Sequence, residues 1–97
     1  MKAYELLFFV NPAIEEEARA ALGKRVDNAI TAQGGVIDTT EEWGKRKLAY
    51  EINKLSDGDY TLIKFHANPT SIEEIDRILS ITDAIERFII VRQYDYN

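Results

Sequence analysis

The chain of 97 residues contains no cysteine, a single histidine and no long apolar run. Without cysteine, a disulfide-stapled scaffold and a thiolate metal site are excluded. A site of two histidines and a carboxylate is also excluded, because His66 is the only histidine. No stretch approaches the roughly 18 apolar residues of a transmembrane helix. The apolar run at residues 6–10 is too short for a signal peptide, so we expect a cytoplasmic protein.

Basic residues are outnumbered, with 12 lysines and arginines against 17 aspartates and glutamates and a net charge of −5. That balance argues against a protein that coats nucleic acid with its whole surface. Hydrophobic residues make up 45% and charged residues 30%, which is typical of a globular protein. The length predicts one domain over residues 1–97, with a short polar tail at residues 93–97.

The apolar pattern predicts the order strand, helix, strand, strand, helix, strand. The expected strands cover residues 3–10, 36–53, 60–67 and 84–92, with the second interrupted at Gly44 and a turn at residues 56–59. We expect Asn11 to cap the first helix, Pro12 to open it and glycines 34 and 35 to end it. Ser71 and Glu74 form a capping-box pattern before the second helix.

Two strand–helix–strand halves with right-handed crossovers predict an α+β, ferredoxin-like fold. Its four-stranded antiparallel sheet would carry both helices on one face. The first and last strands are apolar at both alternating positions, so some apolar residues must lie on the uncovered face. We expect these to be Leu7, Phe9, Ile89 and Val91. Three alternatives are open for these residues. Loops or the tail cover them, they remain exposed to solvent, or a partner protein binds them.

Catalytic constellations are scarce in this sequence. The single histidine lies on an expected strand, and the few serines form no nucleophile–base set with it. Residues 11–14, Asn-Pro-Ala-Ile, cannot form the arginine-bearing phosphate loop that acyl-phosphate hydrolysis requires on this fold. A base-stacking RNA-recognition signature on the third strand is weak, because acidic residues surround its glycine and Leu62 and Lys64 would face outward. We therefore expect neither an enzyme nor a cofactor.

The basic residues concentrate in one segment, where Lys45, Arg46 and Lys47 follow Gly44. Residues 44–54 hold four basic residues and one acidic residue, a net charge of +3, which leaves −8 for the rest of the chain. A glycine inside a strand pattern indicates a bulge, which would present the cluster at a sheet edge. The charges either protect that edge from pairing with another strand or contact phosphates.

The order and spacing of these motifs resemble the bacterial small-subunit ribosomal protein six family over nearly the whole chain. The most specific run is WGKRKLAYEI at residues 43–52, and further support comes from Tyr4-Glu5, Asn11-Pro12, Gly34-Gly35, Gly58-Asp59-Tyr60, Arg87 and Val91-Arg92. The resemblance implies a structural protein that binds the central domain of 16S ribosomal RNA together with ribosomal protein eighteen. Many family members carry a C-terminal extension that contacts this partner. We expect it to be short or absent here, where the sequence stops at Asn97.

We therefore expect a structural RNA-binding protein whose basic edge contacts phosphates, while its apolar surface meets the smaller basic protein. The candidate RNA-binding residues are Lys45, Arg46 and Lys47, with Lys2, Arg87 and Arg92 as further candidates. The candidate partner-binding residues are Leu7, Phe9, Ile89, Val91 and Tyr94. The alternative is a ferredoxin-like module that binds a protein or a small molecule and ignores RNA.

Overall fold

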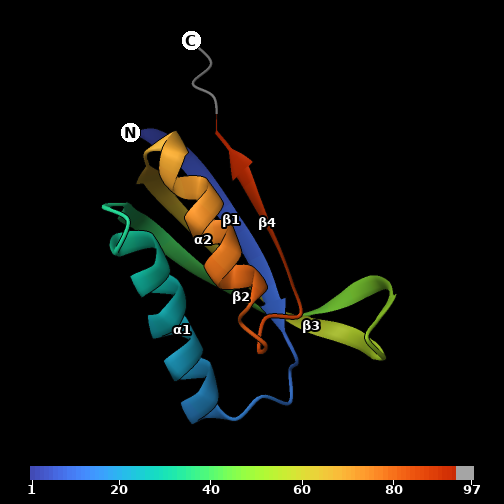
Figure 1. The fold of residues 1–97 in the computed structure, drawn as a ribbon. Helices are drawn as coiled ribbons and strands as arrows, with labels where there is room; N and C mark the ends of the chain where they lie inside the picture. The colour runs from blue at the N-terminus through green and yellow to red at the C-terminus, as the bar shows by residue number, and fades with distance from the viewer. Residues whose placement is uncertain (94–97) are drawn as a thin grey trace.

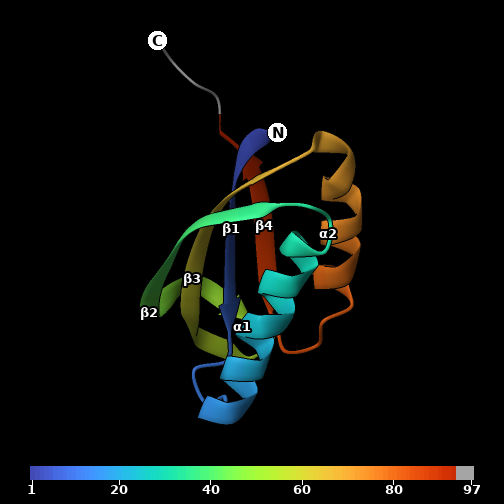
Figure 2. The same cartoon turned by 90° about the vertical axis from the view of Figure 1, so that its left-hand side faces the viewer.

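The computed structural model describes residues 1–93 and shows a single four-stranded antiparallel sheet with strand order β2-β3-β1-β4. The elements are β1 (Lys2–Val10), α1 (Glu16–Thr31), β2 (Val36–Ile52), β3 (Leu55–Ala67), the 3-10 turn η1 (Pro69–Ser71), α2 (Ile72–Ser80) and β4 (Arg87–Arg92). Figure 1 shows the long β2–β3 hairpin, and Figure 2 shows both helices against one side of the sheet. The predicted ferredoxin-like fold is confirmed.

The hydrophobic core fills the space between the helices and the sheet. Alternate residues of the central strand β1 point into it, which settles which side of that strand is covered. The core consists of Tyr4, Leu6, Phe8, Val10, Leu22, Val26, Ile30, Ile63, Phe65, Ala67, Ile75 and Leu79. Burying each large apolar side chain stabilises the fold by about 1.5–3 kcal/mol relative to leaving it exposed. The other side of β1 faces the uncovered side of the sheet.

The first helix begins later than the sequence predicted. The backbone N–H of Ile14 donates to the carbonyl oxygen of Asn11 at 3.0 Å, and the N–H of Ala13 donates to Asn11 Oδ1 at 2.9 Å. These bonds close a turn in which Pro12 supplies a suitable φ, so the helix starts only at Glu16. Placing Asn11 as the cap and Pro12 as the first helical residue was wrong.

The turn of the β2–β3 hairpin also differs from the prediction. It lies at Asn53 and Lys54, whose φ values of 51° and 66° match a two-residue hairpin loop with both residues in the left-handed region. The residues assigned to the turn, 56–59, lie inside β3. Gly58 is needed there for close packing, because a Cβ would lie 2.6 Å from Cδ2 of the Phe9 ring.

The hairpin extends beyond the rest of the sheet. Because β1 ends at Val10, opposite Asp59, residues 46–58 pass its end as a two-stranded hairpin arm (Figure 1). Near the tip, Asn53 Nδ2 donates to Glu86 Oε2 at 3.0 Å. The hairpin arm therefore reaches the segment just before β4.

The last two elements start differently from the prediction. Ser71 precedes α2 as expected, but its side chain makes no capping bond, and Oγ donates to the carbonyl of Gln33 at 3.4 Å. The turn η1 already occupies the backbone there, and Glu74 pairs with Arg77 instead of closing a capping box. β4 begins at Arg87 and not at residue 84, because Thr82 and Ile85 close a turn before it.

Candidate nucleic-acid interface

The predicted bulge forms at Gly44, whose φ of 75° lies in the left-handed region that favours glycine. The register with β3 shifts between Glu42 and Gly44, so Trp43 is the extra residue of β2. β2 is an edge strand of the sheet. The basic cluster therefore follows the bulge directly and lies at the edge of the sheet, where the hairpin arm begins.

The three residues of the basic cluster alternate between the two sides of the hairpin. Lys45 and Lys47 pair with Asp59 and Asp57, on the side of the helices, whereas Arg46 pairs with Gly58 and lies on the uncovered side. All three cations are exposed. The cluster therefore presents positive charge on both sides of one edge.

Two carboxylates of β3 approach the lysines, and they are neutralised to different extents. Asp57 Oδ2 lies 3.9 Å from Lys45 Nζ, a long and exposed ion pair that contributes little stability. Asp59 is held by Arg19 of α1, which donates from Nε to Oδ2 at 2.6 Å and from NH2 to Oδ1 at 3.2 Å. The hydrogen bond to Asp59 raises the pKa of the Arg19 guanidinium despite its partial burial. Because Arg19 neutralises Asp59, the cluster keeps most of its positive charge.

The uncovered side of the cluster borders aromatic rings. Trp43, Arg46 and Tyr60 line an open surface hollow of about 430 Å³, called the aromatic hollow below, and Lys47 also borders this hollow although its register places it on the other side of the strand. The ring centroids of Trp43 and Tyr60 lie 6.5 Å apart, and those of Tyr60 and Phe9 lie 5.1 Å apart. Three aromatic side chains thus run from β2 through β3 to β1 beside the two cations.

One further predicted cation lies towards this end of the molecule. Arg87 is opposite Phe9 of β1, which is opposite Tyr60, which in turn is opposite Gly44. Arg87 and Gly44 therefore share one row of the sheet, three strand spacings or about 14 Å apart. Positive charge therefore lies near both edge strands at this end of the sheet.

The remaining two predicted cations lie elsewhere. Arg92 is opposite Tyr4, close to Lys2 at the beginning of β1. Lys2 and Phe9 are seven residues apart on the same strand, which corresponds to about 24 Å at roughly 3.4 Å per residue. The structure does not bring Lys2 and Arg92 together with the basic cluster.

The uncovered sheet face holds the predicted apolar residues. Leu7 pairs with Ile89, and the positions of Leu7, Phe9, Ile89 and Val91 alternate with residues that point towards the helices, which confirms their face. Ile89 is 56% exposed and Val91 46% exposed, whereas Leu7 is half-buried. Phe9 is only 5% exposed, since its ring packs against Tyr60 and over Gly58. Tyr94 lies outside the described residues.

His66 has an ordinary surface environment. Its Nδ1 lies 2.5 Å from Oδ2 of Asp38, the extra residue of a second bulge in β2. Within residues 1–93 no group of three or more histidine, aspartate or glutamate side chains is placed to hold a metal ion. In the same part of the chain, no helix has the length and apolar character to cross a membrane.

The sequence reasoning missed two contributors to this region. It did not place Trp43 beside Tyr60, because the bulge changes which side chains of β2 and β3 become neighbours. It also missed Arg19, although its spacing three residues before buried Leu22 places it at the margin of the covered helix face. That spacing was a readable signal for Arg19. Predicting the neighbours of Trp43 would have required the exact register of β2 against β3.

Comparisons with known proteins give one consistent result. The family model for Ribosomal protein S6 matches residues 3–92. The small ribosomal subunit protein bS6 of Clostridium novyi (strain NT) is 47% identical over 91 residues, covering 94% of this chain and 96% of that protein. The bS6 of Clostridium perfringens (strain SM101 / Type A) is 47% identical over 93 residues, covering 96% of this chain and 98% of its own length.

Solved structures agree with the sequence comparisons. The crystal structure of 30S ribosomal protein S6 from Thermotoga maritima superposes with a TM-score of 0.89 at 36% identity, covering 95% of this chain and 87% of that one. A protein of Arabidopsis thaliana with a TM-score of 0.59 and 11% identity shares the fold alone. The chain therefore belongs to the bacterial ribosomal protein S6 family, whose members are structural proteins of the small ribosomal subunit and not enzymes.

Proposed function

We propose that this chain binds the central domain of 16S ribosomal RNA within the small subunit, together with ribosomal protein eighteen. The main observation in support is the exposed cluster of Lys45, Arg46 and Lys47 at a bulged sheet edge of an otherwise acidic chain. Lysine and arginine contact phosphates and fix the position of a protein on RNA without reading its sequence. Membership of the ribosomal protein S6 family supports RNA as the partner of this edge.

The uncovered sheet face suits a protein partner. Ile89 and Val91 expose apolar surface beside half-buried Leu7, and exposed apolar patches commonly mark protein interfaces. In this proposal Phe9 supports the surface from below, and Tyr94 stays a predicted contact. The acidic charge of the remaining chain would attract a basic ribosomal protein and leave the basic edge for RNA.

Charge reversal of the basic cluster tests the RNA contact. The variant carries Lys45→Glu, Arg46→Glu and Lys47→Glu, and its complex with ribosomal protein eighteen is titrated with the central-domain RNA at several salt concentrations. Each phosphate contact that is lost should lower the slope of log affinity against log salt by roughly one unit. We expect a slope reduction of about three units and at least a hundredfold weaker binding near physiological salt.

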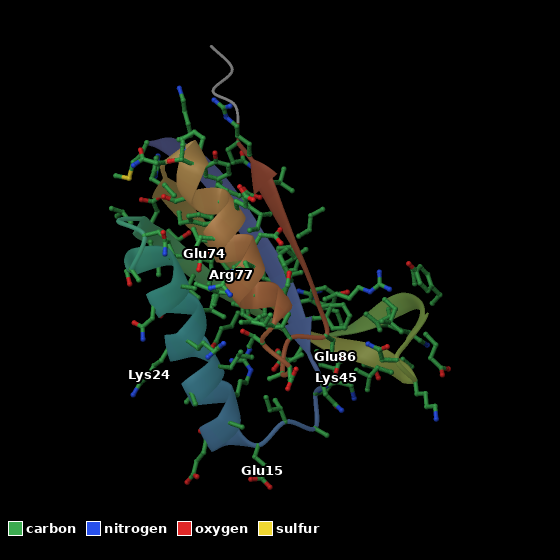
Figure 3. All side chains as sticks on the ribbon, in the orientation of Figure 1. Glu15, Lys24, Lys45, Glu74, Arg77 and Glu86 are labelled. Carbon is green, nitrogen blue, oxygen red and sulfur yellow. The ribbon has the colours of Figure 1, made fainter. Side chains whose placement is uncertain are left out.

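A matched control reverses one cation away from the arm. Lys24 extends from the outer side of α1, far from Lys45 in Figure 3, so we expect Lys24→Glu to change affinity less than threefold and to leave the salt slope intact. Unchanged affinity and slope in the triple variant would rule out phosphate contact by the cluster. Pairing with ribosomal protein eighteen without any measurable binding of the unmodified complex to the RNA would favour the alternative of a protein-interaction module.

A further inference from the structure

The aromatic hollow has a composition that the phosphate contacts do not explain. Trp43 and Tyr60 form one part of its lining, and Arg46 and Lys47 form the rest. Trp43 is 40% exposed, which is unusual for the only tryptophan of a chain with a complete hydrophobic core elsewhere. An exposed indole face beside two cations suits a flat, uncharged ring attached to a phosphate.

Supporting contacts hold the rings in place from behind. Tyr60 packs on Phe9, whose ring lies over Gly58 and leaves no space for a Cβ there. Trp43 Nε1 donates to Glu41 Oε1 at 3.4 Å, a long and exposed hydrogen bond. The packed rings of Phe9 and Tyr60 give Trp43 a fixed neighbour, which lowers the cost of ordering the stacking surface.

We propose that the aromatic hollow binds an unstacked nucleobase of the RNA, which stacks on Trp43 while Arg46 and Lys47 contact the flanking phosphates. This inference rests on the proposed function and adds the class of nucleotide that this edge selects. Single-stranded or bulged nucleotides offer a free ring face, whereas paired RNA does not. Stacking of a base on an aromatic side chain tolerates different bases, so the hollow selects unpaired structure and not a particular letter.

The test compares aromatic and charge variants in one binding assay. Complexes of each variant with ribosomal protein eighteen are titrated with the central-domain RNA at several salt concentrations. We expect Trp43→Leu to weaken binding roughly 10- to 100-fold without changing the salt slope, and Trp43→Phe to keep most of the affinity. Charge reversal of the basic cluster changes the salt slope, whereas loss of the indole does not. The assay therefore tests phosphate contact by the cluster and base stacking on Trp43 independently.

Tyr50 provides a matched aromatic control, since it is 67% exposed on the hairpin arm and does not line the hollow. Tyr50→Leu should leave RNA affinity within twofold. Ultraviolet cross-linking of the unmodified complex gives an independent readout, with a nucleotide from a loop or bulge expected on Trp43. Wild-type affinity in Trp43→Leu would overturn the inference. So would a loss of pairing with ribosomal protein eighteen in that variant, or a cross-link confined to other residues.

Discussion

The sheet has two edge strands, and they differ in length, charge and exposed apolar surface. β2 has 17 residues, two single-residue bulges and a cluster of three cations, and none of its residues is fully buried. β4 has six residues, packs Phe88 and Ile90 against the core and exposes Ile89 and Val91 on the uncovered face. Bulges and charge deter strand pairing along the long edge of β2, and the charge suits a phosphate backbone. A short strand with exposed apolar side chains suits a protein surface.

The difference between the edges also exists on the side of the helices. β4 contributes apolar side chains to the core, whereas the corresponding side of β2 carries Thr40 and Glu42 near the bulge. Glu42 accepts from Arg19 NH1 at 3.2 Å, within the same network that holds Asp59. The core therefore fixes β4 through Phe88 and Ile90 and the start of β2 through Ile37, while β2 near the bulge depends on its pairing with β3 and on polar contacts with α1.

Placing charge on the apolar edge is expected to have the largest effect on pairing with the protein partner. We predict that Ile89→Asp with Val91→Asp weakens pairing with ribosomal protein eighteen at least tenfold, because a buried interface would then contain unpaired carboxylates. The fold should persist, since both side chains are exposed in the isolated chain. Isothermal titration calorimetry measures the affinity for ribosomal protein eighteen. At concentrations where the variant still pairs with that protein, the salt dependence of RNA binding should equal that of the unmodified chain.

Ile81→Asp is the matched control for that variant. Ile81 is as exposed as Ile89 but lies at the end of α2, away from the uncovered sheet face. Its substitution should not alter pairing. Equal losses in both variants would mean that the apolar edge has no special part in binding the partner.

A second prediction concerns the point where the hairpin arm leaves the sheet. Gly58→Ala places a Cβ 2.6 Å from the Phe9 ring, so Phe9 must move and disturb Tyr60. We expect a loss of about 1–3 kcal/mol in the free energy of unfolding, as for other overpacked sites. Urea denaturation measures this loss, and amide exchange should increase in residues 46–58 more than in β4.

Gly23→Ala is the corresponding glycine control. A Cβ at Gly23 meets no atom within 4 Å, and the residue lies inside α1. The change should stabilise the chain by about 0.5–1 kcal/mol, because alanine favours a helix more than glycine does. A comparable loss at both glycines would show that close packing under Phe9 is not the reason for Gly58.

The sequence allowed the fold to be predicted because each element has a clear period or boundary. The alternation in β1, the helical spacing of Leu22, Val26 and Ile30, and glycine at the bulge were all readable. The hairpin turn was not, because Gly58 has the composition of a turn but is needed for contact with Phe9, a residue distant in sequence. Turn residues Asn53 and Lys54 carry no glycine, which hid a left-handed loop.

The candidate site was predictable only in part, for a related reason. A run of three cations is visible in any sequence, so the basic cluster was found. The separation of Lys2 and Arg92 from it follows from strand register, which the sequence does not specify by itself. The aromatic hollow depends on the same register and on the shift at Trp43.

The partly polar space between α1 and β2 leads to the smallest predicted effect. A cavity of about 180 Å³ lies there, lined by apolar residues of the core and by the polar side chains of Arg19, Asp27, Thr40 and Glu42. Partial desolvation raises the pKa of the Asp27 carboxyl above its ordinary value of 3.8. The charge of Asp27 thus opposes folding slightly on the side of the molecule where β2 is least packed.

Asp27→Asn tests whether this polar space weakens the β2 edge. Because the folded chain holds the Asp27 proton at pH values where the unfolded chain has released it, stability falls as the pH rises from about 3.8 through the folded pKa and stays lower above it. We expect the variant to gain less than about 0.5 kcal/mol at pH 7, since solvent screens a carboxylate that is largely exposed. As the pH falls below about 3.8 the aspartate becomes protonated in both the folded and the unfolded chain, so the gain should shrink. Urea denaturation at pH 3.5 and pH 7 measures the difference, and a gain of equal size at both pH values would assign the effect to the side-chain exchange itself and not to the charge of Asp27.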